Sequence, residues 1–585
     1  MARIKPRPQA KGNRCLLVIF DSRNYLDYVF VPETIFQALD HMGLPYRKLD
    51  LANANLQQED LREEAVILLA QDHLGKSLGG NDVQAIVEAV EDGTGLVVFD
   101  HDIDKYGPDF VQWLGVETDN PTFEGVGMAV CWNIQISDND HFITYTQDLG
   151  SKKELLKPLE VCKLKLLEKK LDVLIETDDG RPILVAGLQR KGRVVLFTID
   201  PHVWSSQFYG HLAGLDDVFW KSIVWSARKP FIMAAMPPYI AVRLDDAQGK
   251  WRDKPFGYVD IMNDYGFVPN VALFMDDITP SGVERIRELQ SAGRAEFSPH
   301  SLTYNELIYF RRGKEDYTPA EIERHTRHID KLLSAWGVNR SAILNNHWFE
   351  IGRTALPYLK RIGQEYIMTS FLPGEPFEGV HKDWKPAPYG NITYVMDYLN
   401  GNPDLFSVMA LDLPYHARTE LPDGNYALNI ATLTEWDFLF GNTTFNSENP
   451  FNNIDRAARA FSRHLRKGLD CLLFGSSITH EYMIAQLTPD EWSSLLKQAL
   501  SAMTRYEKIF VGYDHVARYA RSIYDTSIVR VEADKNGIMC DLQGQTFVPL
   551  NLYLFTDVDG SVEKRFIDVP VFKGDSSILV EDVRG

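Results

Sequence analysis

The sequence predicts a multidomain α/β protein with three segments: a doubly wound α/β domain, a barrel of strand–helix units and a small antiparallel β-sandwich. The chain has 585 residues, and a chain of this length usually divides into several domains, each with its own hydrophobic core. Short apolar runs alternate with amphipathic stretches over most of its length, which is typical of parallel sheets covered by helices. The last part has a period of two, which indicates antiparallel strands. We expect the domains at residues 14–230, 236–515 and 520–585.

The first segment alternates between apolar strands and amphipathic helices, so we expect a parallel sheet with helices on both faces. Three later apolar runs are joined by short polar connections and predict antiparallel strands. The expected strands are Cys15–Phe20, Ala65–Leu69, Leu96–Phe99, Leu171–Glu176, Ile183–Leu188 and Val194–Ile199, and the expected helices are Thr34–Met42 and Asp82–Glu91.

The second segment follows a proline-containing connector, 230–238, and resumes the alternation. One helix has a clear start, because Thr318 precedes Pro319, and Glu321 lies three residues after Thr318 as in a capping box. Seven strand–helix units predict a barrel with a gap in its wall, and its chemistry is expected at the C-terminal ends of the strands. The expected strands are Tyr239–Leu244, Val268–Phe274, Ala295–Ser298, Ala342–Asn345, Tyr366–Thr369, Ser407–Leu411 and Cys471–Phe474.

The last segment has alternating apolar residues, with Asp557–Gly560 as a turn. This pattern predicts a small antiparallel β-sandwich. Its expected strands are Ser527–Glu532, Gly537–Leu542, Val548–Phe555 and Phe566–Val571.

Charge and composition exclude several classes of partner. The formal net charge is −20, which argues against a nucleic-acid or anionic-membrane surface, since both need a basic footprint. No run of about 18 apolar residues occurs, so we expect no membrane span. The five cysteines are scattered without a CxxC pair, which indicates neither a zinc knuckle nor a disulfide scaffold. The sequence gives no indication of the oligomeric state.

The N-terminal sequence is compatible with two predictions of the cellular compartment. Residues 1–14 are basic, but only six apolar residues follow, too few for the apolar region of a signal peptide, and they fit a strand better. We expect a bacterial periplasmic or secreted protein if a leader has been removed upstream, and a cytoplasmic one otherwise.

Two adjacent carboxylates, Asp245 and Asp246, end the first strand of the predicted barrel. Such a pair is costly beside a buried strand, because like charges repel and burial penalises each ionised form. Neighbouring residues on a strand point to opposite faces, so one carboxylate could bind a metal while the other acts as a base. The alternative is a plain strand-ending turn in which Gly249 supplies a positive φ.

Further polar residues lie at the ends of other barrel strands. A lone histidine is more often structural than a ligand, but several on one rim together with two aspartates favour a metal site. Histidine and carboxylate ligands suit zinc or a similar divalent ion. The residues are His300-Ser301, Asn345-Asn346-His347-Trp348, Asp412, His416 and His480.

This second segment resembles the polysaccharide deacetylase superfamily, carbohydrate esterase family four and its relatives. Asp245-Asp246 matches the first motif with Gly249 two residues late, His300-Ser301 matches the start of the second motif, and His480 matches the last. The resemblance implies a distorted (β/α)7 barrel and a carbohydrate deacetylase. One departure is Tyr304, which stands where the family has its second metal-binding histidine, so His347 is the candidate third ligand.

The resemblance also implies roles for individual residues. A divalent metal, expected to be zinc, would be held by Asp246, His300 and His347 with an open position for water. Asp245 would be the general base and His480 the general acid. Arg243 would hold Asp245 ionised or face outward, and aromatic residues, Trp384 among them, would stack on sugar or pack in the core. The candidate substrate-binding residues are Arg243, Asn305, Trp348, His416 and Trp436.

The first segment resembles class I glutamine-amidotransferase-like domains, which are flavodoxin-like α/β folds. The resemblance lies in Gly192–Thr198 and Asp216–Lys229. The family's nucleophile is a cysteine on a sharp turn after a strand, and no cysteine here follows that pattern, so we expect a non-catalytic domain. The alternative is a small-molecule or sugar site at the strand ends near Asp21, Asp100 and His101.

Three functions therefore compete. The first is a metal-dependent hydrolase that removes acetyl groups from a carbohydrate or polysaccharide. The second is a glycoside hydrolase or lyase that uses two of four carboxylates as acid and base, and the third is a non-catalytic glycan-binding or assembly protein. The four carboxylates are those of Asp245, Glu350, Asp412 and Glu435.

Overall fold

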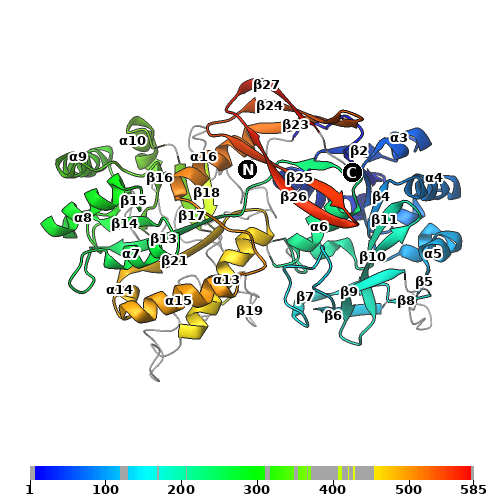
Figure 1. Cartoon of the computed structure of the whole chain (residues 1–585), viewed down its shortest axis with the longest axis horizontal. Helices are drawn as coiled ribbons and strands as arrows, with labels where there is room; N and C mark the ends of the chain where they lie inside the picture. The colour runs from blue at the N-terminus through cyan, green and yellow to red at the C-terminus, as the bar shows by residue number, and fades with distance from the viewer. Residues whose placement is uncertain are drawn as a thin grey trace. The chain divides into compact units, whose positions relative to one another are not determined.

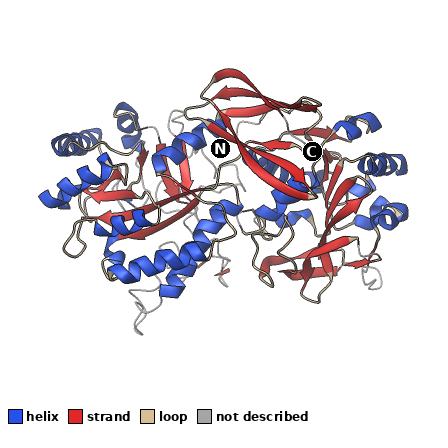
Figure 2. Ribbon diagram, in the orientation of Figure 1, coloured by secondary structure: helices blue, strands red, loops and turns tan. Residues whose placement is uncertain are grey.

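The computed structural model describes most of the chain, which folds into two compact units. One unit spans residues 236–521, and the other joins residues 5–235 with 522–585. Each unit is described by itself (Figures 1 and 2). The described residues are 7–118, 129–167, 170–205, 207–211, 213–309, 317–347, 353–364, 366–370, 406–410, 419–420, 426–427 and 454–581.

A mixed sheet forms the core of the unit that contains the N-terminal residues. Its described strands follow the order β2-β1-β3-β4-β11-β10-β9-β6-β7, parallel from β2 to β11 and antiparallel from β11 to β7. The multidomain α/β class is thereby confirmed, as is the antiparallel arrangement of β9, β10 and β11. The strands are β1 (Leu16–Phe20), β2 (Tyr46–Asp50), β3 (Val66–Leu69), β4 (Gly95–Phe99), β6 (Ala129–Ile136), β7 (Lys152–Val161), β9 (Leu171–Thr177), β10 (Pro182–Gln189) and β11 (Gly192–Phe197).

Helices cover both faces of this sheet (Figure 1). Two glycines allow close packing: a Cβ on Gly95 would lie 2.2 Å from the carbonyl oxygen of Ser226, at the end of α6, and one on Gly192 would lie 2.3 Å from that of Val90 in α4. The backbones of the two helices therefore pack directly against the backbones of the strands, with no side chain between them. The helices of this unit are α1 (Tyr25–Tyr28), α2 (Gln37–Met42), α3 (Gln58–Glu63), α4 (Gly80–Glu91), α5 (Pro108–Leu114) and α6 (Asp216–Ser226).

The C-terminal strands form two antiparallel sheets and belong to the same unit as the N-terminal residues. One sheet has the order β23-β24-β27, and the other is β12-β25-β26, in which β12 (Phe231–Met233) comes from the expected connector. The antiparallel strands are thus present, whereas a separate β-sandwich domain stays a prediction. The strands are β23 (Thr526–Asp534), β24 (Gly537–Gln545), β25 (Leu550–Val558), β26 (Ser561–Val569) and β27 (Lys573–Glu581).

The other unit is built on parallel strands in two groups, as far as the structure describes it. Backbone ladders join β15-β14-β13-β21 in one group and β16-β17-β18 in the other. Closure into a (β/α)7 barrel stays a prediction. The strands are β13 (Tyr239–Ala247), β14 (Asn270–Phe274), β15 (Glu296–Ser301), β16 (Ile343–Leu344), β17 (Tyr366–Ser370), β18 (Phe406–Ala410) and β21 (Gly475–His480).

Amphipathic helices flank these strands and bury their apolar side chains against them. The predicted capping box is confirmed: Thr318 Oγ1 accepts a hydrogen bond from Glu321 N, and Glu321 Oε2 accepts one from Thr318 N. Among the helices described in the chain, none is long and apolar enough to cross a bilayer. The helices of this unit are α7 (Gly257–Asp264), α8 (Pro280–Ser291), α9 (Pro319–Trp336), α10 (Leu356–Arg361), α13 (Ile454–Asp470), α14 (Glu481–Ile484), α15 (Pro489–Ser501) and α16 (Tyr513–Tyr524).

The position of the strand predicted at Cys471–Phe474 is wrong. Those residues form the turn after α13, where Leu472 has a φ of 52°, and the strand is β21, which begins at Gly475. Gly468 explains the tight turn, because a Cβ there would lie 2.0 Å from the carbonyl oxygen of Phe474. The shift makes His480 the last residue of a strand.

Glu296, at the start of β15, is expected to make this unit less stable as pH rises. Burial, with the charge of Asp514 second, raises its pKa to about 8. Its pKa in the unfolded chain is about 4.3, so between roughly pH 4.5 and 8 the folded state binds more protons and stability falls by up to ~1.4 kcal/mol per pH unit. We expect Glu296→Gln to remove this slope in thermal unfolding measured from pH 5 to 8. Glu284→Gln, an exposed control on α8, should keep the slope, and equal slopes in all three proteins would contradict the assignment.

Candidate metal centre

The carboxyl ends of neighbouring strands bring the predicted site residues of this unit together. Asp245 and Asp246 lie at the end of β13, and His300 lies near the end of β15. His347 follows β16, and His480 ends β21, where it is the ladder partner of Asp245. Parallel strands present their carboxyl ends at the same edge, so side chains far apart in sequence meet there.

A β-bulge at the end of β13 positions the two aspartates. In the ladder with β14, Leu244 pairs with Val271 and Ala247 pairs with Leu273, so one extra residue lies on the β13 side. Asp246 has a φ of 57°, a left-handed conformation that costs of order 1–3 kcal/mol for such a residue. The bulge interrupts the regular strand pairing at the two aspartates.

Three candidate ligands converge on one point. Asp246 Oδ1 lies 3.3 Å from His300 Nε2 and 3.1 Å from His347 Nδ1. The two imidazole rings are 4.8 Å apart at 74° to one another, and one ligand atom from each of the three side chains lies within 4.8 Å of the others. Both histidines are buried. This carboxylate and these two imidazoles form a donor set that suits zinc.

The hydrogen bond of His300 determines which nitrogen faces the centre. His300 Nδ1 donates to the carbonyl oxygen of Asn345 at 2.9 Å, so in the neutral ring Nε2 carries a lone pair toward Asp246. Asp246 Oδ1 is buried and accepts no hydrogen bond from the described part of the chain. Two lone pairs that face each other at 3.3 Å repel unless a proton or a metal cation lies between them. A ligand histidine held by a backbone carbonyl is the usual arrangement at metal sites.

Burial and neighbouring charge set the ionisation of these ligands. Burial by itself would raise the pKa of Asp246. When a proton rather than a metal cation lies between its carboxylate and the imidazoles of His300 and His347, their hydrogen bonds and the charge of His480 lower that pKa well below its ordinary value. Burial lowers the pKa of His347, which favours its neutral form. An ionised carboxylate and a neutral imidazole are the forms that bind metal.

Asp245 is held by a different set of groups. Asn345 Nδ2 donates a hydrogen bond to Asp245 Oδ1 at 2.9 Å. The Nε atom of the fully buried Arg243 lies 4.0 Å from Asp245 Oδ2, and Arg243 Nη1 lies 3.2 Å from Met368 Sδ. The charge of Arg243 is therefore directed at Asp245 inside the protein, and the two aspartates are free to have different roles.

His480 and Glu481 connect the end of β21 to the centre. His480 is half-buried, and its positive charge helps to lower the pKa of Asp246. Glu481 was not predicted as a site residue: it is buried, its pKa is raised to about 7 by burial, and it accepts hydrogen bonds from the backbone N–H groups of Gln248 and Gly249. This contact fixes the loop that follows the two aspartates. Its position directly after His480 at the end of a strand was the feature of the sequence from which Glu481 could have been predicted as a site residue.

The remaining predicted site residues are exposed or lie outside the described residues. Asn305 and Tyr304 are exposed in the loop after β15, and the Tyr304 ring lies 6.0 Å from that of His347. Their substrate-binding role stays a prediction. The predicted residues that lie outside the described ranges are Trp348, Glu350, Trp384, Asp412, His416, Glu435 and Trp436.

Comparisons with known proteins give weak similarities. No protein-family model matches the chain, and no curated protein sequence matches it. A protein assigned as a polysaccharide deacetylase, from Mycobacterium smegmatis, is 12% identical over 50% of this chain and 95% of its own, with a TM-score of 0.32. A chitin deacetylase from Colletotrichum lindemuthianum is 11% identical over 49% of this chain and 91% of its own, with a TM-score of 0.26. A β-galactosidase from Bacillus circulans is 14% identical over 37% of this chain and 31% of its own, with a TM-score of 0.24. Similarities of this size identify no family.

Proposed function

We propose that the chain is a metal-dependent hydrolase that removes acetyl groups from a carbohydrate or polysaccharide. The observation that carries the proposal is the meeting of Asp246 Oδ1 with the imidazole nitrogens of His300 and His347 at 3.3 and 3.1 Å. A second carboxylate, Asp245, lies next to this donor set without belonging to it. Metal-dependent acyl hydrolysis needs both parts: a cation site and a separate proton acceptor.

Each residue has a task in this reaction. Zinc held by Asp246, His300 and His347 would supply a Lewis acid for the acetyl carbonyl and lower the pKa of a nearby water. Asp245 accepts a proton from the attacking water, with Asn345 and Arg243 holding its carboxylate in place. His480 donates a proton to the departing nitrogen or oxygen. The water oxygen joins the acetyl carbon, the carbon–nitrogen or carbon–oxygen bond to the sugar breaks, and acetate and a free amine or hydroxyl result.

The products of the reaction test this assignment. We expect the purified full chain to release acetate from N- or O-acetylated oligosaccharides, measured on a panel of both kinds, without generating new reducing ends. Acetate release should stop when a chelator removes the metal. New reducing ends without acetate would assign the chain to the glycoside hydrolases or lyases, and glycan binding with neither product would assign it to the non-catalytic binding proteins.

A further inference from the structure

A second cluster of histidines and aspartates lies in the other unit, at the carboxyl ends of its parallel strands. The chain passes from β1 to β2 on one side of β1 and then to β3 on the other, so the sheet order reverses between β1 and β3. Ligands of open α/β sheets bind at such a reversal, outside the carboxyl ends of the strands. Asp72 and His73 follow β3, His101 follows β4, and Asp200 and His202 follow β11.

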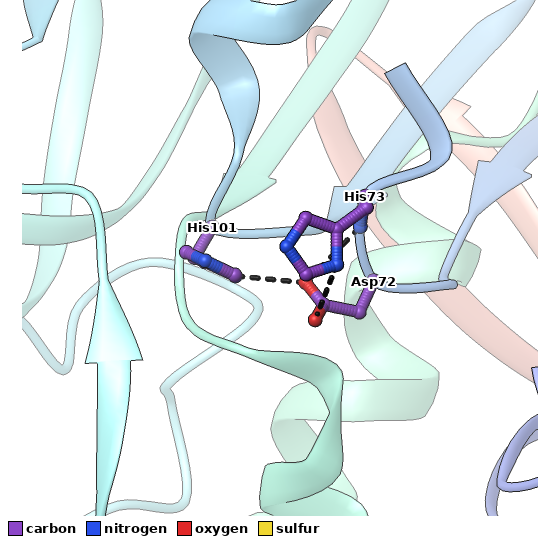
Figure 3. Close-up of side chains that lie close together, drawn as sticks. All are labelled: Asp72, His73 and His101. Carbon is purple, nitrogen blue, oxygen red and sulfur yellow. Dashed lines mark hydrogen bonds and ion pairs between the residues drawn. The ribbon is translucent and has the colours of Figure 1, made fainter. Parts of the chain in front are cut away.

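Asp72 is the centre of this cluster (Figure 3). Its Oδ2 lies 2.9 Å from His73 Nδ1, and its Oδ1 lies 2.8 Å from His101 Nδ1. The two imidazole rings are 5.5 Å apart at 78° to one another, so they approach the carboxylate from different directions. One ligand atom from each of the three side chains lies within 4.8 Å of the others. This is the same composition as the Asp246 centre: one carboxylate and two imidazoles.

His101 is a buried imidazole that lies between two carboxylates, those of Asp72 and Glu160. The residue is 6% exposed, and its Nδ1 lies 2.8 Å from Asp72 Oδ1. Its Nε2 lies 2.8 Å from Glu160 Oε2, close enough for an Nε2–H group to donate a hydrogen bond to that oxygen. A neutral imidazole has one N–H, so when Nε2 donates to Glu160 the lone pair of Nδ1 is directed at Asp72. The same buried nitrogen can then bind a metal with Asp72.

Further side chains complete the surroundings of Asp72. Asp200 and His202 form a second group with it, again with one ligand atom each within 4.8 Å. His73 has a φ of 58°, a strained left-handed conformation, and its Nε2 lies 3.4 Å from Asp102 Oδ2. Strain of this kind persists where the surroundings require it and is frequent at binding sites. Asp27 Oδ2 lies 3.3 Å from His73 Nδ1, so carboxylates surround the imidazoles and the local charge favours a cation.

We propose that this cluster is a second metal site, which binds a divalent ion of the zinc class through Asp72, His73 and His101, with Asp200 and His202 as additional ligands on the same carboxylate. Mixed imidazole and carboxylate ligands select zinc and its neighbours over calcium or magnesium, which prefer oxygen alone. The site is independent of the Asp246 centre, because it lies in the other unit. The domain expected from the sequence to be non-catalytic is thus a metal-binding domain.

Zinc binding to the full chain in which the Asp246 centre has been disabled tests the proposal. The His300→Ala chain, stripped with a chelator and dialysed against zinc, is expected to retain about one zinc ion, because a complete donor set of three side chains remains. Adding Asp72→Asn or His101→Gln should weaken zinc binding at least tenfold, since each removes a ligand. The readout is zinc content by elemental analysis, and it does not depend on any catalytic activity.

Matched variants keep the test interpretable. His328→Ala removes a histidine that contacts one carboxylate, Asp276, at 2.6 Å, and it should leave zinc content unchanged. His73→Ala serves if the buried substitutions prevent folding, because the His73 side chain is 30% exposed. Zinc should also raise the unfolding temperature of His300→Ala more than that of His300→Ala/His73→Ala at the same zinc concentration. A His300→Ala chain that binds no zinc, or that binds it equally well with Asp72 or His101 replaced, would overturn the proposal in favour of a protonated His101 between two carboxylates.

Discussion

Asp246→Asn is expected to abolish zinc binding at the centre formed with His300 and His347. Asp245→Asn is expected to keep the zinc and to lower the rate of acetate release by about 10²–10⁴-fold. The difference follows from their partners. Asp246 Oδ1 faces two imidazole nitrogens, so an amide there replaces an anionic ligand by a neutral one. Asp245 contacts an amide and a guanidinium, so its replacement removes a proton acceptor and leaves the ligands in place.

Zinc content and initial rate, measured on the same samples, separate the two roles. The measurements belong in an Asp72→Asn background, so that zinc in the other unit does not contribute. Both variants are nearly isosteric, so without metal they should unfold at temperatures close to that of the metal-free parent chain. Equal zinc loss in both variants would show that the two carboxylates share the metal. An unchanged rate in either would remove the proposed mechanism.

His480→Ala is expected to slow acetate release from an N-acetyl sugar by about 10²–10⁴-fold, and to slow release from an aryl acetate ester far less. An amine departs only with a proton, which His480 supplies, whereas a phenolate with a low pKa leaves without one. Zinc content should be unchanged, because His480 lies at the end of β21 outside the three-ligand group. The ratio of the two rates is the decisive quantity, since it is insensitive to small changes in the amount of folded protein.

A matched control for this variant is Tyr482→Phe. The Tyr482 ring lies 5.3 Å from that of His480 and is exposed, so removal of its hydroxyl tests whether a small change beside the end of β21 is enough to change the rate ratio. The ratio should stay at the parent value in Tyr482→Phe. If His480→Ala slows both substrates equally, His480 is a positioning residue and the proton comes from elsewhere.

The sequence predicted strand positions well where apolar runs are short and bounded by turns. β1, β3 and β4 lie within one or two residues of their predicted bounds, because each strand is buried on both faces and reads as a continuous apolar run. The strand β2 was missed, since it lies at the sheet edge and only Tyr46 of its residues is buried. The strand β21 was displaced, because the apolar run before it packs as a turn.

The candidate site was predictable as a set of strand ends, and its geometry was not. Asp246, His300 and His347 were named from their places after strands, and they meet. The bulge that brings Asp246 to the imidazoles has no sequence signature beyond the aspartate pair itself. In the other unit the sequence indicated Asp21, Asp100 and His101, whereas the cluster is centred on Asp72. Asp21 instead pairs with Arg23, and Asp100 is fully buried with Tyr106 as its hydrogen-bond donor.

Metal-dependent deacetylation is tested most directly by the return of acetate release when zinc is added to the metal-free full chain. We predict no release without metal, recovery as zinc is added, and no recovery in His300→Ala at any zinc concentration that leaves the protein folded. The Asp72→Asn chain should recover like the parent, because its remaining centre is the one that carries the reaction. Full activity in the metal-free chain, or equal recovery in His300→Ala, would contradict the assignment of the reaction to the Asp246, His300 and His347 centre.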